Sequence, residues 1–177
     1  HFRVFVYDVL LIRRSGLFLS AYYQGVPRKP KPSDGFFRQL RAISHFVSIG
    51  AQEGLDPNPL FSIRFYLTAY PDVGESGINP LIHYIYYGSK EGRSTHTLFD
   101  GAFFQRQLKE DANSLDTSLG DFLKNGVSGD RNPCLLFDCI YYLSQEPDLT
   151  AYSGNPLIHY LKVGADSGFD PHRYFSS

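Results

Sequence analysis

Asn79-Pro-Leu-Ile-His-Tyr84 recurs letter for letter as Asn155-Pro-Leu-Ile-His-Tyr160, and the two starting positions differ by 76, which is twice 38. Weaker versions of the segment begin one period before the first copy, at Arg41, and one period after it, at Thr117. The same interval separates four glycines and four phenylalanines, namely Gly50, Gly88, Gly126, Gly164, Phe61, Phe99, Phe137 and Phe175. We interpret the chain as an array of repeats with a 38-residue period.

Each repeat is predicted to contain two short helices joined by turns. A residue whose side-chain oxygen can accept a free backbone N–H precedes each helix. These residues are Ser62, Asp100 and Asp138 for the first helix, and Asn79, Thr117 and Asn155 for the second. Pro80 and Pro156 take the first helical position, where a missing N–H costs nothing. The glycines from Gly50 to Gly164 are predicted to end the second helix in the left-handed conformation.

Such short helices are unstable alone in water, so neighbouring repeats must cover their apolar faces. The predicted fold is therefore all-α, with tandem helix-turn-helix repeats stacked as a short α-solenoid or a compact helical array. Residues 1–14 form a capping segment, and their β-branched side chains leave helix and strand both open. Residues 15–177 form a single repeat domain of about four units, 15–60, 61–98, 99–136 and 137–175, with a basic, proline-rich insertion at 27–34 in the first unit.

Charge is unevenly distributed along the 177 residues, although the net charge is only −1. Residues 1–41 contain eight Lys and Arg against two Asp, a balance of +6, and the remainder carries −7. The insertion holds three of these cations, Arg28, Lys29 and Lys31, which could meet phosphates, acidic lipid or an acidic polysaccharide. A solvated loop is the alternative. Nucleic acid is not the expected partner, because the loop lacks interleaved aromatic residues.

The longest apolar stretch, from Val4 to Ile12, is too short to span a bilayer and contains Asp8, so no transmembrane segment is predicted. Cys134 and Cys139 match no metal or redox spacing and are predicted to be small buried side chains. Free thiols favour a reducing compartment. The expected location is the cytoplasm, with attachment to the surface of the inner membrane left open.

Three histidines, His45, His83 and His159, occupy equivalent positions of their repeats. A metal site would need their nitrogens about 2 Å from one ion, whereas equivalent positions of packed helices lie about 8–10 Å apart. We therefore predict no metal site and a structural role for each histidine. Arg93 and Arg131 lie in the turns between repeats, where they could join neighbouring units or bind a polar ligand.

The repeats resemble a tandem helical repeat that accompanies glycosyltransferases in bacterial proteins of surface-polysaccharide synthesis. The resemblance covers about residues 15–175. It rests on Ser15-Gly-Leu-Phe18, Phe65-Tyr-Leu67, Pro71-Asp-Val73, Asn79-Pro-Leu81, His83-Tyr84, Gly88, Glu91-Gly-Arg93 and Leu98-Phe-Asp100. The third unit departs from the pattern, with Gln105 in place of Leu, Lys109 in place of Pro and Asp121 in place of His.

No glycine-rich phosphate loop, nucleophile elbow, zinc-protease helix or Asp-x-Asp pair occurs in the sequence. The resemblance implies a non-catalytic interaction or scaffolding module that serves a glycosyltransferase. Two alternatives stay open, a carbohydrate-binding module and an accessory part of a glycosyltransferase whose active site lies mostly outside this chain. The expected partner is another protein or a linked glycosyltransferase domain, with polysaccharide as a further candidate and no cofactor.

Overall fold

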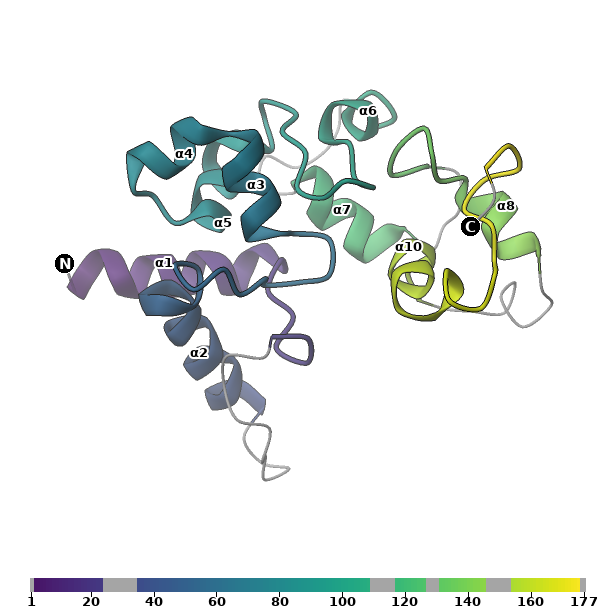
Figure 1. Ribbon diagram of the computed structural model, residues 1–177. Coiled ribbons are helices and arrows are strands. Elements are labelled where there is room, and N and C mark those ends of the chain that lie inside the picture. The colour runs from purple at the N-terminus through teal and green to yellow at the C-terminus, as the bar shows by residue number, and fades with distance from the viewer. Residues whose placement is uncertain (1, 24–34, 109–116, 127–130, 146–153, 176–177) are drawn as a thin grey trace. The chain divides into compact units, whose positions relative to one another are not determined.

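The structure is a computed structural model that describes residues 2–23, 35–108, 117–126, 131–145 and 154–175. The chain divides into two compact units, His1–Lys90 and Glu91–Ser177, and each is described by itself. Within the described ranges, the backbone forms helices, turns and isolated bridges but no named strand (Figure 1). The all-α class predicted from the sequence is therefore confirmed.

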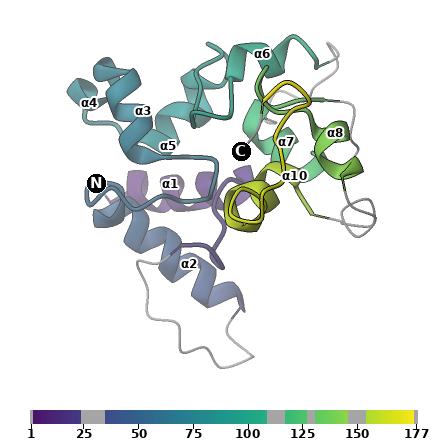
Figure 2. The ribbon, with the colours of Figure 1, turned by 45° about the vertical axis from the view of Figure 1, so that its right-hand side comes forward.

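The N-terminal segment is a helix, α1 (Phe2–Ser15), which resolves the choice between helix and strand. Val9 and Ile12 are buried on the side that packs against α2 (Gly35–His45) and α5 (Pro80–His83). The helix ends at Gly16, whose positive φ of 71° is a left-handed conformation that glycine adopts without strain. Figure 2 gives a second view of α1 and α2.

The second repeat contains one more helix than the two predicted. Ser62 caps α3 (Ile63–Ala69) by accepting the N–H of Phe65, and Asn79 caps α5 by accepting those of Leu81 and Ile82. Between them lies α4 (Pro71–Ser76), which Pro71 opens at its first position. A proline that cannot continue α3 is well suited to begin a new helix, because its fixed φ is already helical.

The Glu91–Ser177 unit contains short helices of the same kind. In the described part of this unit, the α-helices are α6 (Gly101–Gln105), α7 (Ser118–Asn125), α8 (Cys139–Ser144) and α10 (Pro156–His159). The predicted caps all form, since Asp100, Thr117, Asp138 and Asn155 each accept a backbone N–H of the helix that follows.

The predicted left-handed role of the recurring glycines is wrong. In three repeats the second helix widens into a π-helical turn that ends at the glycine: η1 (Phe46–Gly50), η2 (Tyr84–Gly88) and η3 (Tyr160–Gly164). The chain stays right-handed there, and the next residue still donates to a carbonyl of that turn. The left-handed residues come four positions later, at Gly54, Gly92 and Gly168.

Each repeat contains a cluster of three aromatic rings, all of them buried except the half-buried Tyr160 of the fourth repeat. In the second repeat Phe61, Tyr66 and Tyr84 are fully buried, with ring centroids 5.2–6.1 Å apart. The equivalent clusters are Phe18–Tyr23–Phe46, Phe99–Phe104–Phe122 and Phe137–Tyr142–Tyr160. The cluster around Phe18 shows that the looser first copy has the same core as the others.

Side-chain amides join successive segments of the Glu91–Ser177 unit. Gln145 donates to the carbonyl of Asp170 (2.7 Å) and accepts its N–H (2.9 Å), and Gln107 makes the same pair with Asn132. Asn155 caps its own helix and also donates to the Phe122 carbonyl at 2.9 Å. The two glutamine pairs each link segments within one repeat, and the Asn155–Phe122 bond connects the third repeat to the fourth. All of these bonds use backbone groups rather than charged side chains.

Candidate functional site

Each recurring histidine is hydrogen-bonded to a tyrosine that comes earlier in its own repeat: Tyr66 lies on α3, Tyr142 lies on α8, and Tyr23 follows a turn. The Tyr hydroxyl and the His Nδ1 are 2.7 Å apart in Tyr23–His45, 3.1 Å in Tyr66–His83 and 2.5 Å in Tyr142–His159. The three tyrosine rings are buried. The pair connects two segments of one repeat, and the structural role of the histidines stays a prediction.

The recurring glycine makes room for this pair. A Cβ placed on Gly50, Gly88 or Gly164 would overlap the hydroxyl of Tyr23, Tyr66 or Tyr142 respectively. The tyrosine hydroxyl therefore occupies the space that any larger residue would need. The glycine is needed because the tyrosine hydroxyl approaches its backbone closely, and its own φ is not in the left-handed region.

The third repeat lacks both members of the pair. Phe104 stands where the others have tyrosine, and Asp121 stands where they have histidine. Asp121 instead forms an ion pair with Arg131 at 2.9 Å and accepts from Asn125. The Arg131 guanidinium also lies over the Phe104 ring, 5.7 Å from its centroid. A histidine at position 121 would find no hydroxyl group on Phe104 to bond with. The tyrosine and the histidine are therefore both replaced in this repeat.

The candidate ligand-binding arginines take part in local interactions. Arg93 contacts Glu91 at 2.5 Å in the turn that precedes the third repeat, and Arg131 is held by Asp121. Arg28, Lys29 and Lys31, with the rest of the insertion at 27–34, lie outside the described residues. The structure thus brings none of the predicted cations together around a shared space in the part of the chain that it describes.

A second recurring position is absent from the sequence-based prediction. Asn58, His96, Cys134 and His172 follow one another at the same interval as the glycines, and each forms a bridge with the repeat phenylalanine three positions later. The side chains of three of them accept a backbone N–H two positions on, as a turn-forming residue does. Burial lowers the pKa of His96. The repeat interval was the signal that could have revealed this position.

Both cysteines are buried and free, as predicted. Burial raises the pKa of Cys134, and it raises that of Cys139 to about 12. The reactive form of cysteine is the thiolate, so these thiols are inert at neutral pH. Among the described residues, no group of three His, Cys, Asp or Glu side chains is arranged to hold a metal ion.

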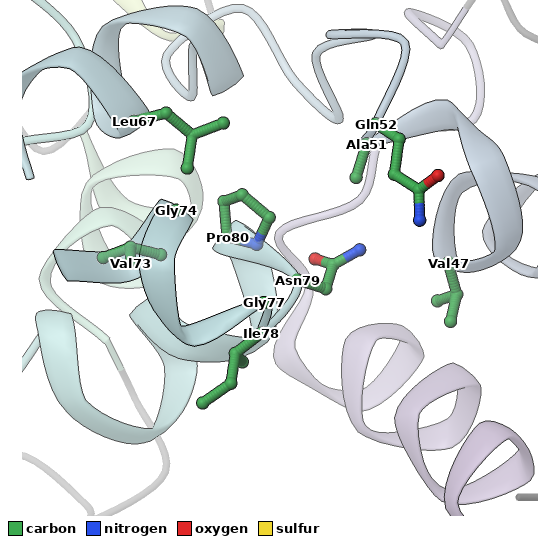
Figure 3. A pocket seen from close by; sticks show the side chains of 10 residues that line it. All are labelled: Val47, Ala51, Gln52, Leu67, Val73, Gly74, Gly77, Ile78, Asn79 and Pro80. Carbon is green, nitrogen blue, oxygen red and sulfur yellow. The ribbon is translucent and has the colours of Figure 1, made fainter. Parts of the chain in front are cut away.

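A pocket of about 270 Å³ opens in the His1–Lys90 unit, between the end of η1 and helices α3, α4 and α5 (Figure 3). Aliphatic groups form much of its wall, contributed by Val47, Ala51, Leu67, Val73, Ile78 and Pro80. Figure 3 shows the side-chain amides of Asn79 and Gln52 pointing into the space between these elements. Since none of the described residues that line it is charged, the chemistry of the pocket suits an uncharged group with hydrogen-bonding atoms.

The pocket lies at the second-repeat counterpart of a contact that is closed in the fourth. Asn155, the equivalent of Asn79, donates its amide to the Phe122 carbonyl. The Asn79 oxygen caps α5, and its amide nitrogen donates to no acceptor among the described residues. The side-chain NH2 group of Asn79 therefore faces the pocket.

The chain was compared with protein-family models, curated proteins and solved structures. No family model, curated protein or solved structure matches the chain. Within the described segments, no helix has the length and apolar character needed to cross a membrane. The pocket, the paired side chains and the exposed surface are therefore the features on which a functional proposal can rest.

Proposed function

We propose that this chain is a non-catalytic interaction or scaffolding module, with its repeats stacked as a short α-solenoid, and that it serves a bacterial glycosyltransferase of surface-polysaccharide synthesis. The resemblance of the repeats supports the association with a glycosyltransferase. The arrangement of the polar side chains supports the lack of catalytic activity.

The observation that carries the proposal is the use of the recurring polar side chains. His45, His83 and His159 each face a tyrosine hydroxyl through Nδ1, and Arg93 and Arg131 face carboxylates. A general acid or base needs a proton-transferring atom within about 3 Å of its substrate. Groups that link segments of the scaffold are poorly placed for that task, and they stabilise the thin helical layers instead.

A carbohydrate-binding module is the second candidate, and the pocket beside Asn79 favours it. Amide side chains bind sugar hydroxyls well because they both donate and accept hydrogen bonds. At about 270 Å³ the pocket is smaller than most sites for drug-sized ligands, so it suits one sugar ring or one substituent.

The proposal predicts that the purified chain consumes no nucleotide-sugar above the rate of a blank, measured by chromatography of the donor and the released nucleotide. It also predicts co-elution with the purified glycosyltransferase encoded with it, with binding quantified by calorimetry. Donor turnover would contradict a non-catalytic role. Failure to co-elute at micromolar concentrations would contradict the association.

The second candidate predicts chemical-shift changes at the Asn79 and Gln52 side-chain amides when oligosaccharides of the native polysaccharide are added. Asn79→Ser should abolish the changes without unfolding α5, because serine also caps helices well. Gln52→Ala should weaken them, and Glu53→Ala, a neighbouring exposed position, should leave them intact. Unchanged spectra at millimolar sugar would eliminate this candidate.

A further inference from the structure

The outer face of α1 is apolar and basic at once. Val4, Tyr7 and Leu10 are exposed, Val4 at 64% and Tyr7 at 59%, and they follow one another at intervals of three positions. They lie on the side of the helix away from the buried Val9 and Ile12. Arg3 and Arg14 are exposed at the two ends of the same stripe.

Helix α2, which packs against α1, has the same character. Phe37 is 74% exposed and Phe36 is exposed beside it, with the two rings in edge-to-face contact. Arg41, also exposed, follows Phe37 by one helical turn and so lies on the same side. The Arg13 guanidinium lies 4.5 Å from the centroid of the Phe36 ring and connects the two helices. We call the exposed residues Arg3, Val4, Tyr7, Leu10, Arg14, Phe36, Phe37 and Arg41 the α1–α2 face.

The charge around this face is strongly positive. Helices α1 and α2 contain five arginines and a single acidic side chain, Asp8, a balance of +4. Asp8 is half-buried, and desolvation raises its pKa. Residues 42–177 carry −7, so the net positive charge of the sequence lies in residues 1–41, which include α1 and most of α2.

We propose that the α1–α2 face binds the surface of an anionic lipid bilayer. A helix that lies in the headgroup region places apolar side chains at the acyl boundary and basic side chains at the phosphates. The face has this arrangement, because arginines alternate with apolar side chains along it: Arg3 beside Val4, Leu10 before Arg14, Phe37 before Arg41. The core of a protein interface is instead depleted of charge, with charged groups at its rim. The inference does not depend on a link to a glycosyltransferase.

Co-sedimentation of the full chain with vesicles tests the proposal. We expect the chain to bind vesicles of phosphatidylcholine mixed with phosphatidylglycerol, to bind pure phosphatidylcholine at least tenfold more weakly, and to be released by high salt. Each arginine near the surface is worth about a fivefold change in affinity. The double variant Arg3→Glu and Arg14→Glu should therefore lose binding by far more than tenfold. Phe37→Ser should weaken it about tenfold.

Matched control variants lie in the Glu91–Ser177 unit. Leu135 is as exposed as Phe37, and Lys162 is an exposed cation outside the face. Leu135→Ser and Lys162→Glu should bind the vesicles like the wild type, and circular dichroism checks that every variant is folded. Equal binding to neutral vesicles, or equal losses in the controls, would overturn the proposal. A dimer in sedimentation velocity that Phe37→Ser dissociates, without vesicle binding, would overturn it in favour of self-association.

Discussion

Gly88→Ala should destabilise the His1–Lys90 unit by about 3 kcal/mol, because its methyl group would overlap the buried hydroxyl of Tyr66. Tyr66 is fully buried and hydrogen-bonded to His83, so its ring cannot move aside without breaking that bond. Chemical unfolding followed by circular dichroism measures the change. Gly74→Ala is the matched control, since a Cβ there meets only Leu67 at 3.9 Å and lies within a helix.

Tyr66→Phe should partly rescue Gly88→Ala, although alone it costs about 1 kcal/mol through the lost hydrogen bond. Removing the hydroxyl removes the group that the new methyl would overlap. The double variant should therefore be more stable than the sum of the two single changes predicts, by about 1 kcal/mol or more. The third repeat carries the corresponding Phe104. Strict additivity would show that the hydroxyl does not restrict the glycine position.

Phe137→Ala should destabilise the Glu91–Ser177 unit by about 3–5 kcal/mol, the usual cost of emptying a buried aromatic site. Phe137 is fully buried, with its ring centroid 5.2 Å from that of Tyr142 and 5.5 Å from that of Tyr160. The repeat supplies a control at the same register. Phe175 is 46% exposed, so Phe175→Ala should cost less than about 1 kcal/mol.

Thermal unfolding of both variants, with urea titration for the free energy, separates the two outcomes. Equal losses for Phe137→Ala and Phe175→Ala would mean that the packing around Phe175 differs from that described. A loss under about 1 kcal/mol for Phe137→Ala would contradict the assignment of the aromatic cluster as the core.

Helix caps were predictable because they are local. Ser62, Thr117 and Asp138 each accept an N–H three positions later, so the sequence around them contains both partners. The buried phenylalanines were predictable for a related reason, since their recurrence marks positions that every repeat must fill. Residues 1–14 were less clear, because β-branched side chains suit strands as well, and only packing against α2 and α5 indicates a helix.

The histidine partners were not predictable from sequence spacing alone. Tyr66 and His83 are separated by 17 positions, and Tyr23 and His45 by 22, so each hydrogen bond depends on how two segments of a repeat approach each other. The pocket beside Asn79 depends on how η1 approaches α3, α4 and α5, and the α1–α2 face depends on how α1 packs against α2. Neither could be found before the burial of each side chain was known.

By itself, the sequence determined the 38-residue period, the all-α class, the caps and the apolar core positions. These features depend on residue type and on neighbours within a turn or two of the same helix. The tertiary structure alone decided why the recurring glycine is required. Its constraint is the tyrosine hydroxyl that another segment places against it, and a contact between segments distant along the chain is set by packing rather than by local preference.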